Sequence, residues 1–396
     1  ILFEELGFLI GKRERIGFVG RNGSGKSTLF KIILGEVEPD SGEVVIPKGY
    51  KIGALDQHIN FTKPTVLEEC CQVLSEDEQY DWWKAERILF GLGFSEEDLQ
   101  KDPGSFSGGY QVRINLTKAL VQNPNLLLLD EPTNYLDIVS LRWLRGFLKS
   151  FKGEVLLITH DRDFMDSVAT HTAGLARKKL NKFKGNTTKF YEQLAVADEM
   201  YEMTRLTQEK KKKELQGFVD RFGAKASKAT QAQSRAKQIE KMGTMDKLDS
   251  ENNLGFRFHY KTCPGKIILE TKDLSFSYSG NEVDDLFKNL SIDVGSTDRI
   301  GIIGKNGKGK STLLNVIAGE LKARAGNIKT HPSISIGHFG QTNIERLHEN
   351  NTIITEISES NHDLGIGQVR KICGTMMFPD ELAKKKVSVL SGGEKS

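Results

Sequence analysis

Short apolar runs alternate with helically spaced apolar residues along most of this chain. The runs at residues 14–19, 125–129 and 154–158 predict strands, and the consecutive leucines of the second run suit a strand buried on both faces of a parallel sheet. Between residues 41 and 57 apolar residues alternate and glycines interrupt them, which predicts further short strands ending near residue 57. Strands interspersed with helices indicate the α/β fold class.

Apolar residues three or four positions apart predict helices in the remaining stretches. Residues 28–34 should form one helix, residues 64–104 a mainly helical stretch, and residues 107–120 a helix that begins with a Ser-Gly-Gly turn. Residues 186–247 predict a mainly helical segment, and residues 222–228 fit the turn of a helical hairpin inside it.

A glycine-rich motif, Gly-Arg-Asn-Gly-Ser-Gly-Lys-Ser, occupies residues 20–27. It fits the pattern G-x-x-x-x-G-K-[ST] of a phosphate-binding loop, which needs a strand before it and a helix after it, as predicted here. Backbone amides would close around phosphate oxygens, and the helix N-terminus would add partial positive charge. Lys26 would reach the β- and γ-phosphates, and Ser27 would ligate Mg²⁺. The alternative is a glycine turn before an ordinary helix.

The same motif returns 284 residues later, at residues 304–311. Three other features keep this offset: Gln57 with Gln341, Ser-Gly-Gly at 107–109 with Ser-Gly-Gly at 391–393, and Leu-Phe at 2–3 with Leu-Phe at 286–287. Chance does not explain four matches at one offset. The chain is therefore predicted to contain one nucleotide-binding unit twice.

Two carboxylates, Asp130 and Glu131, directly follow the leucine run. The carboxyl end of a buried strand is where ligands bind in α/β sheets. Asp130 can hold Mg²⁺, and Glu131 can orient or deprotonate water; the alternative is a pair of carboxylates that cap a loop. His160 follows the strand at 154–158 and is predicted to contact the γ-phosphate rather than to serve a structural role.

Charge is unevenly distributed along the chain. The net charge is +3, but residues 205–247 hold twelve Lys or Arg and five Asp or Glu, a local net charge of +7 that leaves −4 for the rest. A basic segment between two balanced domains indicates a polyanionic partner; the alternative is a solvated helix face. No apolar run approaches the roughly 18 residues of a membrane span, so a membrane role would require a separate spanning subunit.

Two other residue types have ordinary interpretations. Trp82 and Trp83, in the helical stretch at 64–104, are expected to pack in a core or an interface rather than to stack on nucleic-acid bases. The four cysteines form neither a C-x-x-C pair nor a Cys/His metal pattern, and they suit a reducing cytosol. We expect each of them simply to pack.

The motif order resembles the ATP-binding-cassette (ABC) ATPases. It runs from the phosphate loop through glutamine, Ser-Gly-Gly, Leu-Leu-Leu-Leu-Asp-Glu-Pro and Leu-Asp at 136–137 to Thr-His-Asp at 159–161. Two cassettes, no membrane span and a charged helical linker resemble the ABC-F family, and residues 218–235 resemble its YheS-like branch. Two residues depart from the pattern: Tyr135 stands where the family usually has His, and Lys308 adds a cation to the second phosphate loop.

The resemblance implies two P-loop nucleotide-binding domains joined by a helical hairpin linker. Residues 1–185 would form the first domain, with residues 64–104 as its helical arm, residues 186–260 the linker and residues 261–396 the second domain. The counterpart of residues 267–278 would precede residue 1, and the second acidic pair would fall near position 414, so the chain is expected to be truncated at both ends. The missing strands are expected to keep the second domain from folding completely.

The resemblance also implies that the cassettes close face to face on ATP, within one chain or in a dimer of the truncated chain. Site one would comprise Gly20, Asn22, Gly23, Gly25, Lys26, Ser27, Thr28, Gln57, Asp130, Glu131 and His160 against Ser391, Gly392 and Gly393. Site two would comprise Gly304, Asn306, Gly307, Gly309, Lys310, Ser311, Thr312 and Gln341 against Ser107, Gly108 and Gly109, with Tyr278 stacked on adenine. Mg²⁺ would be held by Ser27, Gln57 and Asp130, and by Ser311 and Gln341. Catalysis in site one would use Glu131, His160 and Gln57. Site two lacks the counterparts of the two carboxylates, so it should bind ATP weakly and not hydrolyse it.

ABC-F proteins are cytoplasmic translation factors that bind the ribosomal tRNA exit site, so the resemblance implies the ribosome, with its rRNA and tRNA, as partner. ATP would act as a population switch between bound and released forms. The linker residues expected to contact RNA are Lys210, Lys211, Lys212, Lys213, Lys225, Lys228 and Arg235. The alternative is an energy-coupling subunit of a membrane ABC transporter, which would not need a long basic hairpin. DNA-repair and ribosome-recycling ATPases are disfavoured, since the sequence lacks their zinc or iron–sulphur cysteines.

Overall fold

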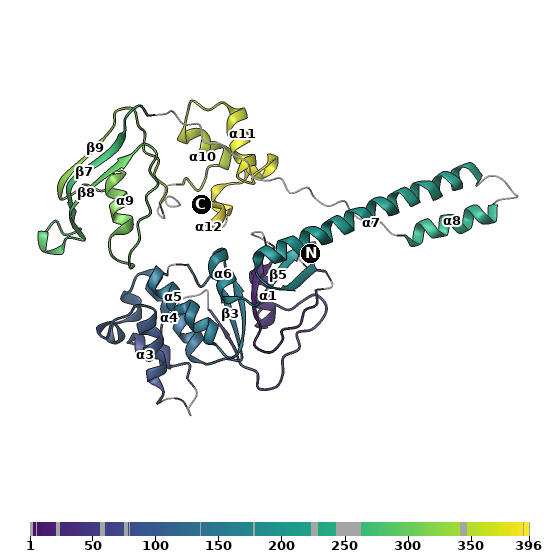
Figure 1. Cartoon of the computed structure of the whole chain (residues 1–396), viewed down its shortest axis with the longest axis horizontal. Helices are drawn as coiled ribbons and strands as arrows, with labels where there is room; N and C mark the ends of the chain where they lie inside the picture. The colour runs from purple at the N-terminus through teal and green to yellow at the C-terminus, as the bar shows by residue number, and fades with distance from the viewer. Residues whose placement is uncertain are drawn as a thin grey trace. The chain divides into compact units, whose positions relative to one another are not determined.

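The computed structural model describes two compact units, Ile1–Leu248 and Asp249–Ser396, which we treat separately (Figure 1). Its described residues are all those of the chain except 1–2, 5, 21–23, 56–59, 75–77, 79, 135, 177–178, 223–228, 243–262, 341–346, 391 and 396. Among them, no helix combines the length and the apolar character that crossing a membrane requires.

The first unit is built on a six-stranded sheet with the strand order β2-β3-β4-β1-β5-β6. Its strands are β1 Arg15–Val19, β2 Ile52–Ala54, β3 Leu126–Asp130, β4 Glu154–Ile158, β5 His171–Ala176 and β6 Lys179–Lys184. The first five are parallel, and β6 is antiparallel to β5. The strands predicted at 14–19, 125–129 and 154–158 are thus confirmed. Because β3, β4 and β1 are neighbours, the segments that follow them emerge at one edge of the sheet.

Helices cover both faces of this sheet. They are α1 Lys26–Ile33, α2 Val66–Cys71, α3 Trp82–Gly91, α4 Gly108–Val121, α5 Ile138–Ser150 and α6 Arg162–Val168, with 3₁₀ turns at Glu97–Gln100 and Pro103–Ser105. Alternate leucines of β3 enter two separate cores: Leu126 and Leu128 pack with α1, and Leu127 and Leu129 pack with α2–α5. Burial on both faces is the reason that this strand is apolar at four successive positions.

Two expectations for the first unit were wrong in part. Within residues 41–55 the structure contains only β2, and Val45 is 81% exposed. In the second unit the equivalent segment, β9, forms a ladder with β7, whereas no described strand of the first unit pairs with residues 41–51. Trp82 and Trp83 are 49% and 48% exposed, which contradicts packing in the core, while packing in an interface stays a prediction. The four cysteines are free.

A helical hairpin follows the sheet, as the apolar spacing predicted. It consists of α7 Thr187–Phe222 and α8 Ala229–Lys241; its predicted turn lies mostly outside the described residues (Figure 1). Asp166 accepts hydrogen bonds from the Thr187 amide and hydroxyl, both at 2.8 Å, and Phe190 is buried against Gly174 of β5. These contacts fix the root of α7 to the sheet.

The second unit has a three-stranded antiparallel sheet, β8-β7-β9. Its elements are β7 Ile267–Phe276, β8 Phe287–Gly295, α9 Lys310–Ile317, β9 Ala325–Thr330, α10 Ile353–Ser360, α11 Ile366–Thr375 and α12 Gly392–Lys395, with 3₁₀ turns at Glu282–Asp284, Asp380–Lys384 and Val387–Val389. Residues 299–303 match β1 at the 284-residue offset, yet they form no strand, and Ile303 is 81% exposed. Strands equivalent to β4 and β5, which flank β1, are absent from the described part of this unit.

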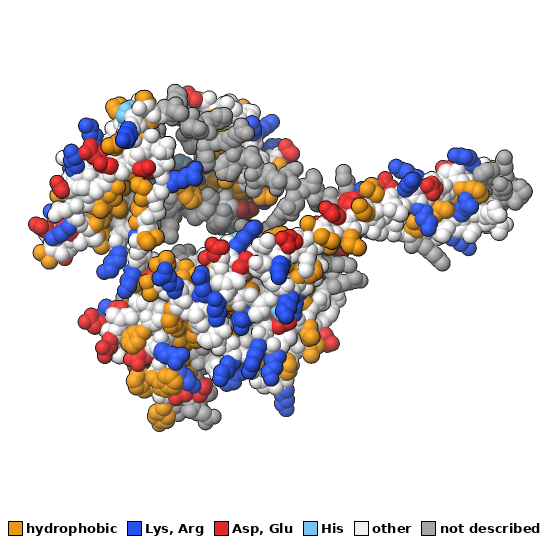
Figure 2. Space-filling view, in the orientation of Figure 1, with side chains coloured by type: hydrophobic (Ala, Val, Ile, Leu, Met, Phe, Trp, Pro, Cys, Tyr) orange, Lys and Arg blue, Asp and Glu red, His pale blue; other side chains and the backbone are white. Residues whose placement is uncertain are grey.

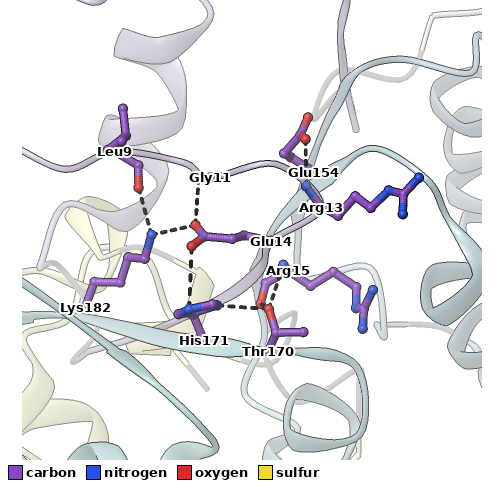
Figure 3. Close-up of polar contacts among 9 residues, drawn as sticks. All are labelled: Leu9, Gly11, Arg13, Glu14, Arg15, Glu154, Thr170, His171 and Lys182. Atoms are coloured by element: carbon purple, nitrogen blue, oxygen red, sulfur yellow. Dashed lines mark hydrogen bonds and ion pairs between the residues drawn. The ribbon is translucent and has the colours of Figure 1, made fainter.

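A polar network joins the first residues of β1 and β5 to β6 (Figure 3). Glu14 accepts hydrogen bonds from Lys182 Nζ at 2.5 Å and the Gly11 amide at 2.8 Å, and it lies 3.5 Å from His171 Nε2. Lys182 also donates to the Leu9 carbonyl at 2.8 Å. Burial alone would raise the pKa of Glu14, but the bonds from Lys182 and Gly11 outweigh it and hold this pKa below its ordinary value. The network therefore stabilises the fold when Glu14 is ionised.

We expect the Glu14→Gln variant to lose about 1–3 kcal/mol of unfolding free energy at pH 7, since a neutral amide oxygen can accept a hydrogen bond from Lys182 but leaves the charge of that lysine unbalanced. A carboxylate with a lowered folded-state pKa contributes stability above its unfolded pKa, and this contribution disappears as the pH falls. The difference between variant and wild type should therefore narrow below a pH of about 4.3. Urea unfolding at pH 7 and at lower pH would measure the stability difference between variant and wild type. The control is Glu43→Gln, because Glu43 is exposed. Equal stability at pH 7 would refute the prediction.

Candidate functional site

The first phosphate loop leaves the end of β1 and enters α1. Gly25 caps α1 with a left-handed backbone, φ 92°, and a Cβ there would lie 2.7 Å from Phe3 Cζ, so glycine is needed both for the turn and for the aromatic ring behind it. Phe3 of the repeated Leu-Phe pair thus packs behind the loop. Lys26 Nζ donates a hydrogen bond to the Gly20 carbonyl at 2.7 Å, which folds the side chain back over the loop. Residues 21–23 lie outside the described part of the chain.

Two predicted metal ligands meet directly. The Ser27 hydroxyl donates a hydrogen bond of 2.6 Å to Asp130 Oδ2, which joins the start of α1 to the end of β3. A hydroxyl and a carboxylate at such a junction are oxygen ligands of the type that Mg²⁺ takes. Burial lowers the pKa of Lys26, while Asp130 and Glu131 oppose that shift. This donor set fits Mg²⁺ together with a nucleotide phosphate.

Glu131 has the environment of a general base. Its backbone is left-handed, φ 49°, and its amide donates to the Ile158 carbonyl at 2.8 Å. Its Oε2 accepts a hydrogen bond from the His160 amide at 3.3 Å, whereas buried Oε1 accepts none from the described residues and lies 3.6 Å from His160 Nε2. Burial raises the pKa of Glu131. A carboxylate oxygen that accepts no hydrogen bond beside the phosphate loop could take a proton from water.

The Ser-Gly-Gly turn is presented outward at the start of α4. Ser107 caps the helix through its carbonyl, which accepts from the Tyr110 and Gln111 amides at 2.9 and 3.1 Å, and its side chain is exposed. A Cβ on Gly108 would meet no atom within 4 Å, so the turn has open space above it. A helix N-terminus of this kind can receive an anion.

The second phosphate loop repeats the first in part. Gly307 and Gly309 have φ values of 75° and 80°, and Lys310 Nζ donates to the Gly304 and Lys305 carbonyls, both at 2.8 Å. Ser311, the counterpart of Ser27, is exposed.

An aromatic side chain lies next to the second loop. The Tyr278 ring is 71% exposed, and its hydroxyl forms a 3.1 Å hydrogen bond with Thr312 Oγ1 at the start of α9. A ring so placed could stack on a base whose phosphates occupy the loop.

Several predicted residues are not brought into these sites by the structure. Gln57, Gln341, Ser391 and the non-matching Tyr135 lie outside the described residues. Because the two units are described separately, the expected pairing of each loop with the Ser-Gly-Gly turn of the other cassette stays a prediction.

The sequence analysis missed a hydrogen bond of 2.8 Å between Thr133 and Thr159, which links the segments after β3 and β4. It also missed Arg113, which is fully buried in α4. The signal for Arg113 was a basic residue among the apolar positions of a predicted helix.

Comparison with known proteins agrees with these motifs. A family model described as "ABC transporter" matches residues 3–134 and 287–396, and a second model with the same description matches residues 173–258. The "Probable ATP-binding protein YheS" of Haemophilus influenzae is 31% identical over 100% of this chain and 67% of its own length. The "Probable ATP-binding protein YbiT" of Escherichia coli O157:H7 is 34% identical over 100% of this chain and 81% of its own length.

The chain thus spans about two thirds of the length of the YheS relative. Among solved structures, one titled as the ATP-binding subunit of an ABC transporter is 24% identical, with a TM-score of 0.44, and covers 49% of this chain and 87% of that one. The tandem cassette matches and the likeness to YheS and YbiT, which extends over all of this chain, show that it belongs to the ABC-F family of ATP-binding-cassette ATPases.

Proposed function

We propose that this protein is a cytoplasmic ATP-hydrolysing translation factor that binds the ribosome near the tRNA exit site. ATP-dependent closure of its two cassettes would control that binding. The hairpin α7–α8 is the observation that carries this proposal, because a long basic hairpin suits RNA and has no evident use in a transporter subunit.

The geometry of the hairpin supports a contact with RNA phosphates. The 36 residues of α7 extend about 54 Å at 1.5 Å per residue. Lys210–Lys213 are consecutive, so their side chains are spread around the helix at steps of about 100°. Lys and Arg side chains lie along the hairpin in Figure 2. Positive charge on several sides of a helix suits a site surrounded by phosphates, and such binding is salt-sensitive and largely independent of sequence.

One predicted RNA contact has a second role in the hairpin. The Arg235 guanidinium carbon lies 3.6 Å from the centroid of the Phe218 ring, which joins α8 to α7. We therefore assign the RNA contact chiefly to Lys210–Lys213, while Lys225 and Lys228 lie outside the described residues. The α7 root is bound to α6 through Asp166 and to β5 through Phe190, so movements of the first cassette would be transmitted to the hairpin.

The ATP chemistry is assigned to the first cassette. Lys26 and the amides of residues 20–27 would bind the phosphates, Ser27 and Asp130 would hold Mg²⁺, and Glu131 would take a proton from the attacking water. Mg²⁺, when bound, would neutralise phosphate charge. His160 would orient Glu131, whose carboxylate its amide already contacts at 3.3 Å.

Co-sedimentation with purified bacterial ribosomes would test this function. The Glu131→Gln variant, in which hydrolysis is slowed, should pellet with ribosomes in ATP and remain in the supernatant without it. In that background, Lys210–Lys212→Gln should weaken pelleting and lower the slope of log affinity against log salt by about 2, since three phosphate contacts are lost.

A matched control exists in Lys384–Lys386, three consecutive lysines of the second unit. Replacing these three lysines with glutamine should leave the slope of log affinity against log salt unchanged. Equal effects of the two triple variants would contradict a specific role for the hairpin. Intact ATP binding without ATP-dependent pelleting would overturn the ribosome proposal and favour the transporter alternative.

A further inference from the structure

The second phosphate loop carries one more cation than the first. Residues 304–311 contain three lysines, whereas residues 20–27 contain one arginine and one lysine. At the 284-residue offset, two of the three lysines match these two cations, and the third, Lys308, takes the place of Ser24. The two loops therefore differ in charge at a single position, and the mechanism assigned to the first cassette gives this lysine no role.

The first loop shows where a side chain at this position lies. Ser24 Oγ and Lys26 Cδ lie 2.9 and 3.8 Å from the point that a Cβ on Gly20 would occupy, so both side chains meet the same face of Gly20. Lys26 Nζ donates its hydrogen bond to the Gly20 carbonyl. Ser24 Oγ is buried and has no hydrogen-bond partner among the described residues. The position of Ser24 is thus next to the lysine that is predicted to bind the phosphates.

The second loop keeps this arrangement but leaves its extra lysine unoccupied. Lys310 Cδ lies 3.9 Å from the point that a Cβ on Gly304 would occupy, and Lys310 Nζ donates to the Gly304 carbonyl, as Lys26 does at Gly20. Lys308 does not turn toward Gly304 as Ser24 turns toward Gly20. Its side chain is exposed and forms no hydrogen bond or ion pair with the residues that the structure describes. An ammonium group on a flexible stem beside a phosphate loop is therefore available to a ligand.

Additional positive charge changes which form of a nucleotide a loop prefers. Bound Mg²⁺ neutralises part of the charge of the phosphate chain, so a metal-free triphosphate is more negative than Mg²⁺–ATP. Because Coulomb attraction grows with the charge of each partner, a lysine beside the phosphates stabilises the metal-free form more. The first loop has a serine at this position, and its hydrogen bond between Ser27 and Asp130 suits a nucleotide that brings a metal ion.

We propose that the second phosphate loop is a metal-independent nucleotide site, in which Lys308 binds the phosphates of a metal-free nucleoside triphosphate. The lysine supplies at this loop positive charge of the kind that Mg²⁺ supplies at the first. Lys308 is thus the residue that determines which form of the nucleotide is bound. The inference goes beyond the proposed function, which assigns the ATP chemistry to the first cassette.

Titration with a fluorescent ATP analogue, in excess EDTA and in Mg²⁺, would test this assignment. The Lys26→Met variant serves as the background, because its first loop should contribute little to either titration. In that background, Lys308→Ser restores the residue of the first loop, and Lys308→Arg keeps the positive charge. Lys322→Ser is the matched control, because it removes another exposed lysine of the same unit.

We expect Lys308→Ser to weaken binding of the analogue in EDTA by about tenfold, which corresponds to the loss of one hydrogen bond to a charged group, and to weaken binding in Mg²⁺ by less. Lys308→Arg should retain most of the affinity in EDTA, and Lys322→Ser all of it. Acetylation of lysines followed by mass spectrometry gives an independent measure. ATP in EDTA should slow the modification of Lys308 and leave that of Lys322 unchanged.

Equal affinities of Lys308→Ser and Lys322→Ser in EDTA would overturn the inference. Absence of binding in EDTA in the Lys26→Met background would do the same, and so would equal losses of affinity in EDTA and in Mg²⁺ for Lys308→Ser. These titrations contain no ribosomes. A protein that fails to pellet with ribosomes would therefore refute the proposed function, while the titrations would still decide the role of Lys308.

Discussion

Replacing Glu131 with glutamine is expected to lower the rate of ATP hydrolysis by about 10²- to 10⁴-fold while ATP binding is kept. Glutamine has nearly the same shape as glutamate, and its side-chain oxygen can still accept the hydrogen bond from the His160 backbone amide. It cannot, however, accept the proton of the attacking water. Burial raises the pKa of Glu131, so the folded state disfavours its ionised form. The neutral variant should consequently be at least as stable as the wild type, which separates a catalytic loss from unfolding.

Steady-state phosphate release and titration with a fluorescent ATP analogue would measure the two effects of Glu131→Gln. Glu154→Gln provides the control: Glu154 begins the neighbouring strand β4 and accepts hydrogen bonds of 2.8 Å from the Arg13 amide and 2.7 Å from the Tyr50 hydroxyl, at the opposite edge of the sheet. The Glu154→Gln variant should hydrolyse ATP at the wild-type rate. A Glu131→Gln protein that retains more than about a tenth of the rate would exclude this glutamate as the base.

The core of the site could be predicted because local sequence determines it. Four leucines require burial on both faces of a sheet, and an acidic pair that follows them must emerge at the sheet edge where ligands bind. The glycines of the phosphate loop adopt backbone conformations that other residues disfavour, as φ 92° at Gly25 shows. These constraints involve residues that are close together in the sequence, so they can be recognised without knowledge of the fold.

The remaining features depend on residues far apart in sequence. Glu14 and Lys182 are 168 positions apart, and no periodicity connects them. Arg113 would ordinarily be placed on a helix surface; only the packing of α3 and α5 around α4 makes it buried. Residues 41–51 alternate as a strand does, but a strand also needs a neighbour for its ladder. The sequence pattern therefore indicates which structure a segment favours, and contacts with distant segments determine whether that structure forms.

The same dependence on partners predicts unequal phosphate loops. Ser27 is bonded to Asp130 at 2.6 Å, whereas its counterpart Ser311 is exposed. A loop with a carboxylate beside it can hold Mg²⁺ and ATP together, whereas the residues described in the second unit place no carboxylate on the Ser311 hydroxyl. We therefore expect most of the measured affinity for Mg²⁺–ATP to come from the first loop.

Lys26→Met should weaken Mg²⁺–ATP binding by about 100-fold, because a charged hydrogen bond to the phosphates is worth roughly 3 kcal/mol and each 1.4 kcal/mol is tenfold. Lys31→Met, on the exposed side of the same helix, should leave affinity unchanged, and Lys310→Met should have a small effect. A fluorescent ATP analogue titrated in each variant would measure this. If Lys310→Met removed most of the binding and Lys26→Met little, the second loop would be the principal nucleotide site. The assignment of Asp130 and Glu131 to ATP would then fail, since both carboxylates lie beside the first loop.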